Sequence, residues 1–136
     1  MSETSRPRVV VVDDNDLTRT LLRSILREGD YEVVGEARDG VGALALAERL
    51  RPEIICLDLV MPQMDGLEAL QTIRLMYPEI AVVMLADRPS KQTVDESIRS
   101  GASGFIVKPF NAAKVLDTVG RARRSANRRD ASQTAD

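Results

Sequence analysis

Three acids and one lysine stand directly after short apolar runs of the sequence. Asp13 and Asp14 follow a run of four valines, Asp58 follows Ile-Ile-Cys-Leu, and Lys108 follows Phe-Ile-Val. If these runs are parallel strands, their carboxyl ends meet at one edge of a sheet. Two carboxylates about 4 Å apart repel by about 4 kcal/mol at an effective dielectric of 20, so three acids gathered there need a cation. Mg²⁺ fits, because it takes a few carboxylates and leaves coordination open for a phosphoryl oxygen.

Each of these residues also has a purely structural interpretation. Asp13, Asp14 or Asn15 would serve as the cap of a following helix, and Lys108 alone is typical of a surface lysine. Asp58 is harder to explain in this way, because it places an ionisable group at the end of a buried strand. Cys56 is typical of a small residue packed in the core.

Five short apolar runs rich in β-branched residues predict five strands. Four of them are continuous, which indicates a parallel sheet covered on both faces, whereas the second carries charges and is typical of an edge strand. The predicted strands are Val9–Val12, Tyr31–Ala37, Ile54–Leu57, Ile80–Leu85 and Phe105–Val107.

The segments between these runs show helical periodicity. The predicted core-facing residues are Leu17, Leu21, Leu22 and Ile25; Ala43, Leu46, Ala47 and Leu50; Leu70, Ile73 and Tyr77; Val94 and Ile98; and Ala112, Val115, Leu116 and Val119. The fourth helix has the least apolar surface, so we expect it to be the least firmly anchored. Asn15 and Asn111 are predicted N-caps, and Gly29 and Gly101 are predicted to follow helix ends.

Five βα units predict an α/β fold with a doubly wound, five-stranded parallel sheet and helices on both faces. Of the two common strand orders, 3-2-1-4-5 and 2-1-3-4-5, the charged second strand favours 2-1-3-4-5, the flavodoxin-like order. We expect a disordered arm over 1–7, one domain over 8–124 and a polar tail over 125–136.

Composition excludes several function classes. The 136 residues suffice for one domain, and a net charge of −2 argues against a globally basic nucleic-acid binder. One cysteine and no histidine exclude a disulfide framework, a Cys/His zinc site and catalysis by an internal imidazole. Two Tyr, two Phe and no Trp leave almost no platform for base stacking. Without an apolar leader or a membrane-spanning run, the chain is predicted to be soluble and cytoplasmic.

Five of the nine residues from 121 to 129 are arginine. We interpret this segment as a solvated helix end whose cations suit the negative end of the helix dipole. A weak patch for anions or nucleic acid is the alternative.

Three motifs carry a family resemblance over roughly residues 8–124. They are Val-Val-Asp13-Asp14, Leu-Asp58-Leu-Val-Met-Pro-Gln-Met-Asp-Gly66, and Gly-Phe105-Ile-Val-Lys108-Pro-Phe. At these spacings the sequence resembles the receiver domain of bacterial two-component response regulators, with the layout of the single-domain chemotaxis regulators.

This resemblance assigns a role to each site residue. It implies that Asp58 is the phosphoacceptor, which takes a phosphoryl group from a phosphohistidine on a partner kinase. It further implies that Asp14, Asp58 and the carbonyl of Val60 bind Mg²⁺, with Asp13 acting through water, and that Lys108 pairs with the phosphoryl oxygens. The donor imidazole then belongs to a partner, a sensor histidine kinase or a phosphotransfer protein.

Further positions concern the conformational switch. Pro109 matches a cis Lys-Pro bond of the family, and Phe105 takes the place of its aromatic switch residue. Ala86 stands where the family usually has Thr or Ser, and Asp87 stands where it usually has a small residue. Phosphorylation chemistry is therefore expected to be intact, while its coupling to the following helix is in question. In the family the lifetime of the phosphoryl group depends on the positions of Val60 and Arg88.

Three other functions compete with this interpretation. A receiver-like interaction module with weak or decoupled phosphorylation is favoured by Ala86 and Asp87. A phosphatase of the haloacid-dehalogenase type is suggested by Asp14-x-Asp16-x-Thr18, a short motif that is weak alone. The chain could also be part of a longer regulator with a DNA-binding domain. We expect a non-enzymatic signalling domain, monomeric or weakly dimeric, with a downstream protein target that the sequence does not identify and no membrane association.

Overall fold

The structure, a computed structural model, describes residues 6–134 and contains one parallel sheet. Its strands lie in the order β2-β1-β3-β4-β5, as predicted. The strands are β1 (Arg8–Val12), β2 (Glu32–Ala37), β3 (Ile54–Asp58), β4 (Ala81–Asp87) and β5 (Gly104–Lys108). The helices are α1 (Asp16–Glu28), α2 (Gly40–Leu50), α3 (Gly66–Met76), α4 (Lys91–Arg99) and α5 (Ala112–Thr134).

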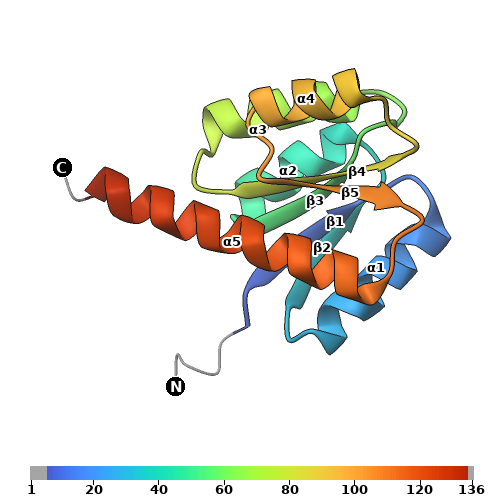
Figure 1. The fold of residues 1–136 in the computed structure, drawn as a ribbon, viewed down its shortest axis with the longest axis horizontal. Helices are drawn as coiled ribbons and strands as arrows, with labels where there is room; N and C mark the ends of the chain where they lie inside the picture. The colour runs from blue at the N-terminus through green and yellow to red at the C-terminus, as the bar shows by residue number, and fades with distance from the viewer. Residues whose placement is uncertain (1–5, 135–136) are drawn as a thin grey trace.

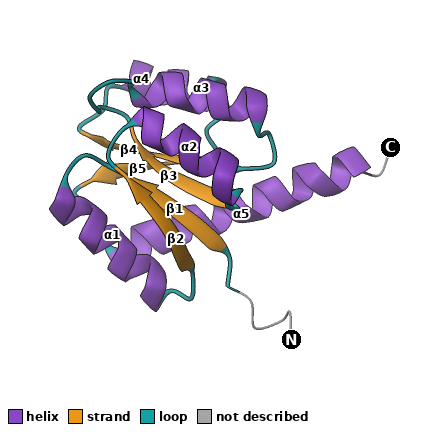
Figure 2. Cartoon of the chain, turned by 180° about the vertical axis from the view of Figure 1, so that it is seen from behind, coloured by secondary structure: helices purple, strands orange, loops and turns teal. Residues whose placement is uncertain are grey.

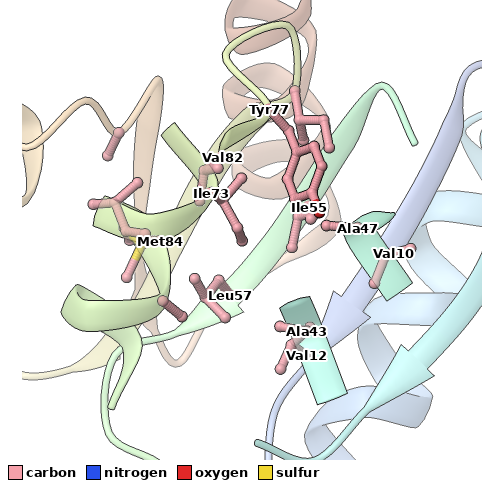
Figure 3. Close-up of a cluster of buried hydrophobic side chains, with 14 of the residues drawn as sticks. Val10, Val12, Ala43, Ala47, Ile55, Leu57, Ile73, Tyr77, Val82 and Met84 are labelled. Atoms are coloured by element: carbon pink, nitrogen blue, oxygen red, sulfur yellow. The ribbon is translucent and has the colours of Figure 1, made fainter. Parts of the chain in front are cut away.

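Helices cover both faces of the sheet, which explains the continuous apolar strands. Figure 1 shows α2, α3 and α4 on one face and α1 and α5 on the other, and Figure 2 shows the same layers from behind. Alternate side chains of β1 pack into the two helix layers, because successive residues of a strand point to opposite faces of the sheet. Val10 and Val12 pack with α2 and α3, as Figure 3 shows in part, while Val9 and Val11 pack with α1 and α5.

Cys56 lies in β3 on the α1/α5 side and is fully buried. Burial in apolar surroundings raises the pKa of its thiol to about 12. The thiol therefore packs as a small apolar residue, as the sequence predicts.

Three predicted helix faces are partly wrong. In α1, Leu22, Ile25 and Leu26 are buried, whereas Leu17 is 81% exposed and Leu21 is 50% exposed. A helix turns by about 100° per residue, so a core-facing stripe centred on the three buried residues leaves the other two at its side.

In α4 the buried residue is Ser97, and Ile98 is 47% exposed, so the predicted core position is displaced by one residue. The buried Ser97 hydroxyl donates a hydrogen bond to the carbonyl of Thr93 (3.0 Å), which lets a polar side chain occupy that position. The expectation that α4 is held by little apolar surface is confirmed. On α5, Ala112 is exposed, while Val115 and Val119 are buried as predicted.

Three of the four predicted caps are present. Asn15 accepts from Thr18 N (2.9 Å), Asn111 accepts from Lys114 N (2.8 Å), and Gly101 adopts φ +108. The prediction for Gly29 is wrong in detail, since its φ is −90 and the left-handed conformation falls on Asp30.

The predicted arm over 1–7 and the predicted polar tail over 125–136 are each described only in part. Residues 1–5 lie outside the described part, but the carbonyl of Pro7 already accepts from Glu32 N (2.9 Å), so the chain joins the edge strand before residue 8. At the other end α5 continues to Thr134, where a polar tail was expected from 125. No glycine or proline follows Gly120, so nothing interrupts the helix, which extends away from the sheet in Figures 1 and 2. Over residues 6–134, none of the helices combines the length and apolarity that a membrane span requires.

Candidate functional site

The strand order brings Asp13, Asp58 and Lys108 together at the carboxyl edge of the sheet. β1 and β3 are neighbours, so Asp13 and Asp58 leave the sheet side by side. Lys108 comes from β5 and reaches them past the end of β4: its Nζ lies 2.7 Å from Asp13 Oδ2 and 3.3 Å from Asp58 Oδ1. One ammonium group therefore links two carboxylates from different strands.

Asp13 is fully buried and is fixed at every polar group. Its backbone N–H donates to Ala37 O (3.1 Å), and its carbonyl accepts from Arg19 (2.7 Å). Its carboxylate accepts from Asn15 N at Oδ1 (2.9 Å) and from Lys108 at Oδ2 (2.7 Å). Four hydrogen bonds thus hold this residue in one position.

Asp14, next in the chain, is exposed, and its side chain makes no hydrogen bond or ion pair within the described part of the chain. Its carboxylate is free to bind a ligand. The two adjacent acids therefore differ in role: Asp13 is part of the framework and Asp14 is available at the surface.

The electrostatic environment of Asp58 resists its ionisation. Burial, followed by the negative charge of Asp13, raises the pKa of Asp58 to about 6, and Lys108 offsets only part of this. For Lys108, burial works to lower the pKa, but the hydrogen bond to Asp13 and the charge of Asp58 outweigh it and leave the pKa raised. Lys108 is thus held in its charged form, and one positive charge faces three carboxylates.

The donor set fits a hard divalent cation. One carboxylate oxygen from each of Asp13, Asp14 and Asp58 lies within 4.8 Å of the others. Oxygen ligands in excess of the local positive charge are what Mg²⁺ requires. The residues present therefore match the ion that the sequence predicts.

The loop from β3 to α3 is pressed against this site. A Cβ atom at Gly66 would collide with the backbone of Asp58 and Leu59, so the close approach requires glycine. Gly66 N donates to Leu59 O (2.8 Å), and Asp65 caps α3 by accepting from Glu68 N (2.9 Å). Val60, in the same loop, is 75% exposed.

The end of β4 offers little to a group bound at Asp58. Ala86 is 3% exposed and has no side-chain donor. Asp87 is exposed, with Arg88 Nε 3.7 Å from its Oδ1, and it lines a cavity of about 520 Å³ together with Asp13, Asp14 and Lys108. Asp87 is therefore a fourth acid near the site, but it does not belong to the close group of Asp13, Asp14 and Asp58.

The two remaining predicted positions lie on and after β5. Phe105 is half-buried and packs against the core cluster of the α2/α3 side. The bond between Lys108 and Pro109 is cis, as predicted.

Sequence reasoning missed Arg19. Its side chain, 13% exposed, contacts Asp16 (2.5 Å) and Glu36 (3.3 Å) as well as the Asp13 carbonyl. The spacing of Asp16 and Arg19 indicates a helical ion pair, but the contact with a backbone carbonyl leaves no signal in the sequence.

Comparison with known proteins gives a consistent result. Residues 9–120 match the profile described as the response regulator receiver domain. The chain is 39% identical over 115 residues to the chemotaxis protein CheY of Listeria monocytogenes, which covers 85% of this chain and 97% of that protein. It is 42% identical over 114 residues to protein CcdB of Bacillus subtilis, with 84% and 95% covered. The receiver domain of the putative response regulator NarL from Mycobacterium tuberculosis superimposes with a TM-score of 0.84 at 30% identity, covering 88% of this chain and 98% of that one.

Proposed function

The chain belongs to the response regulator receiver domain family, and from this membership we propose that Asp58 accepts a phosphoryl group from a histidine kinase or a phosphotransfer protein. The observation that carries the proposal is the position of the Asp58 carboxylate, beside Lys108 and within 4.8 Å of two further carboxylates. In this proposal the domain is a signalling component rather than an enzyme that turns over a substrate.

The transfer uses groups that this chain already positions. A carboxylate oxygen of Asp58 attacks phosphorus, and the bond from phosphorus to the donor imidazole nitrogen breaks, with the electron pair leaving on that nitrogen. Lys108 lies closer to Asp13 than to Asp58, so the ammonium is held in place while the Asp58 oxygens stay available. Its positive charge stabilises the charge on the phosphoryl oxygens.

Mg²⁺ would be held by Asp14, Asp58 and the carbonyl of Val60, with Asp13 acting through water, and would neutralise phosphoryl charge. Burial, and after it the negative charge of Asp13, raises the pKa of Asp58 to about 6, and a bound cation would favour the ionised carboxylate against both effects. Asp13 contributes by holding Lys108.

In the family, phosphorylation is signalled to a downstream protein through the face formed by β4, α4 and β5. We propose that this chain uses the same face, with weaker coupling between phosphorylation and the shape of that face. Ala86 has no hydroxyl to draw the β4–α4 loop toward a phosphoryl group. This observation favours a second candidate function, a receiver-like interaction module whose phosphorylation is weakly coupled to its shape. Cytoplasmic location and a monomeric or weakly dimeric state remain predictions.

The phosphatase alternative is disfavoured by the contacts of Asp16. Its carboxylate is bound by Arg19 at 2.5 Å and by Arg38 at 3.1 Å. It is therefore engaged in an ion-pair network, and the close acidic group comprises Asp13, Asp14 and Asp58.

Labelling with a small phosphodonor tests the proposal. The protein is incubated with acetyl phosphate and Mg²⁺, and the adduct is located by mass spectrometry. We expect at most one phosphoryl group per chain, on Asp58, which Asp58→Asn abolishes and the control Asp95→Asn on α4 leaves intact. Undiminished labelling of Asp58→Asn would contradict the assignment, and steady release of phosphate from a small phosphoester would favour the phosphatase.

A further inference from the structure

Arg19 is the centre of an ion-pair network beneath the acidic site. Its guanidinium donates to the Asp13 carbonyl (2.7 Å), to Asp16 (2.5 Å) and to Glu36 (3.3 Å). These acceptors belong to the β1–α1 loop, the first turn of α1 and the edge strand β2. A planar guanidinium with its donors in a fixed fork is suited to hold three such acceptors at once.

Two neighbouring arginines share the acidic partners of Arg19 and lack its contact with the site. Arg23 NH1 lies 2.6 Å from Glu36, and Arg38 NH1 lies 3.1 Å from Asp16. Among these three arginines, Arg19 is the one that binds the backbone of Asp13. The chain thus contains its own controls for the loss of a positive charge in this network.

The bond to the Asp13 carbonyl fixes the peptide that joins Asp13 to Asp14. Asp13 has three further anchors, at its N–H and at both carboxylate oxygens. Asp14 has no side-chain partner in the described part of the chain, so the direction of its carboxylate depends on the backbone that precedes it. Release of the Asp13 carbonyl would let this peptide rotate and carry Asp14 with it.

We propose that Arg19 is a positioning residue of the metal site, which aims the Asp14 carboxylate by holding the carbonyl of Asp13. This inference rests on the proposed function, because it assumes that Asp14 is a ligand of the cation. Arg19 itself contacts neither the cation nor the phosphoryl group.

The sign of the effect distinguishes positioning from simple electrostatics. Loss of a positive charge near a cation site strengthens cation binding when charge alone matters. Loss of a group that orients a ligand weakens binding, typically by about 10- to 100-fold for partners that hold metal ligands in place. Arg19→Gln is therefore expected to weaken Mg²⁺ binding, whereas Arg23→Gln and Arg38→Gln are expected to leave it unchanged or strengthen it.

The experiment measures the dissociation constant for Mg²⁺ by calorimetry on the full chain and on each variant, with folding checked by circular dichroism. We expect Arg19→Gln to raise the constant about 10-fold. Arg23→Gln and Arg38→Gln should leave it unchanged or lower it. Arg19→Lys keeps the charge without the fork, so we expect a constant between those of the wild type and Arg19→Gln, and this variant decides the question if Arg19→Gln does not fold.

Each outcome has a defined meaning. Wild-type affinity or tighter binding in Arg19→Gln and Arg19→Lys overturns the positioning role and leaves the proposed function untouched. Equal weakening in all three glutamine variants overturns it as well, because the contact with Asp13 would then not matter. If the wild-type chain binds no Mg²⁺, the metal site and this inference fail together.

Discussion

The two sides of Asp58 are built differently. On the β1–α1 side, Asp13 is held by four hydrogen bonds, and α1 is anchored by Leu22, Ile25 and Leu26. On the β4–α4 side, Ala86 offers no polar side chain, and the one residue that α4 buries is Ser97. Both sides adjoin the same carboxylate, but one is a dense polar network on a well-packed helix and the other has neither feature.

This difference separates two requirements of a phosphoacceptor site. Ligands and countercharges must be in place before the phosphoryl group arrives, which the β1–α1 side provides. A segment that changes conformation in response to the group must have a second conformation of similar free energy. Weakly packed elements meet this condition. If Asp58 is phosphorylated as proposed, the lack of a hydroxyl at Ala86 leaves the β4–α4 side without a side-chain donor to the phosphoryl group at this position.

The largest expected effect tests the anchoring of the two helices. Leu22→Ala on α1 removes a fully buried side chain and should lower the free energy of unfolding by about 2–5 kcal/mol. Ile98→Ala on α4 removes a half-exposed side chain and should cost less than about 1 kcal/mol. Urea unfolding of both variants measures the contrast, and similar losses would show that α4 is as firmly packed as α1.

The next effect concerns Asp14, the exposed acid on the β1–α1 side of Asp58. Asp14→Asn should weaken Mg²⁺ binding by about 100-fold, since Asp14 is a proposed ligand of the ion and loss of a group that orients a ligand already costs about 10- to 100-fold. Mg²⁺ at 100 times its dissociation constant should stabilise the wild type by about 2.7 kcal/mol, and the same concentration should stabilise the variant by only about 0.4 kcal/mol. Thermal melting with and without Mg²⁺ checks both, with Asp95→Asn as the control acid on α4. A melting temperature indifferent to Mg²⁺ in the wild type would argue against an assembled site.

A third effect follows from the charge on Asp58. Its pKa is raised from 3.8 to about 6 in the folded chain, so the folded state holds this proton more tightly than the unfolded state does. The stabilisation by the proton is fully present below about pH 4, declines as the pH rises from 4 to 6 and is lost above about pH 6. At pH 7.5 without metal, Asp58→Asn should therefore be more stable than the wild type, by at most about 3 kcal/mol.

The pH dependence serves as the control for this variant. Near pH 4 the wild-type carboxyl is already protonated, so the advantage of Asp58→Asn should vanish. A gain in stability that is equal at both pH values would mean that charge is not its cause. Denaturant unfolding in the presence of a chelator measures it.

The smallest expected effect tests the β4–α4 side. A hydroxyl that donates to a phosphoryl group contributes about 1.5–3 kcal/mol, which is a bias of about 10- to 150-fold toward the state that makes the bond. A phosphoryl-mimicking fluoride complex should change amide hydrogen exchange over 86–105 little in the wild type and more in Ala86→Thr. Ala86→Val introduces a side chain of the same shape as threonine but without the hydroxyl, so this variant should behave as the wild type. Strong protection of the wild type, with no addition from Ala86→Thr, would mean that another group replaces the hydroxyl.

The sequence predicted the sheet because its signals were local and consistent. Apolar strands covered on both faces, a charged edge strand and acids at the strand ends together lead to the observed order and to the meeting of Asp13, Asp58 and Lys108. The errors arose where the helical periodicity of apolar residues is compatible with more than one side of the helix facing the sheet. Leu17 and Ile98 are apolar at near-helical spacing, but the packing of the whole helix decides which side faces the sheet, and Ser97 is buried because its hydroxyl has a local acceptor.

Arg19 shows a second limit of sequence reasoning. Its ion pair with Asp16 is visible three residues apart, but its partners Glu36 and the Asp13 carbonyl come together only through the crossover from α1 to β2. The end of α5 shows a third limit. A polar, arginine-rich segment is compatible with helix or coil. The residues that pack against the core there, Ala122 and Ala126, are too small to give a clear apolar pattern in the sequence.

The reactivity of the Cys56 thiol measures how often the central strand β3 is released from the sheet. Cys56 is the single cysteine of the chain, is fully buried and lies two residues before Asp58 on β3. Because the thiolate is the reactive form and the pKa of this thiol is about 12, an alkylating reagent reacts with it only when the central strand is released. The rate of alkylation therefore reports how often that strand opens, and a ligand bound at the end of β3 should register as slower modification of a sulfur that it never touches.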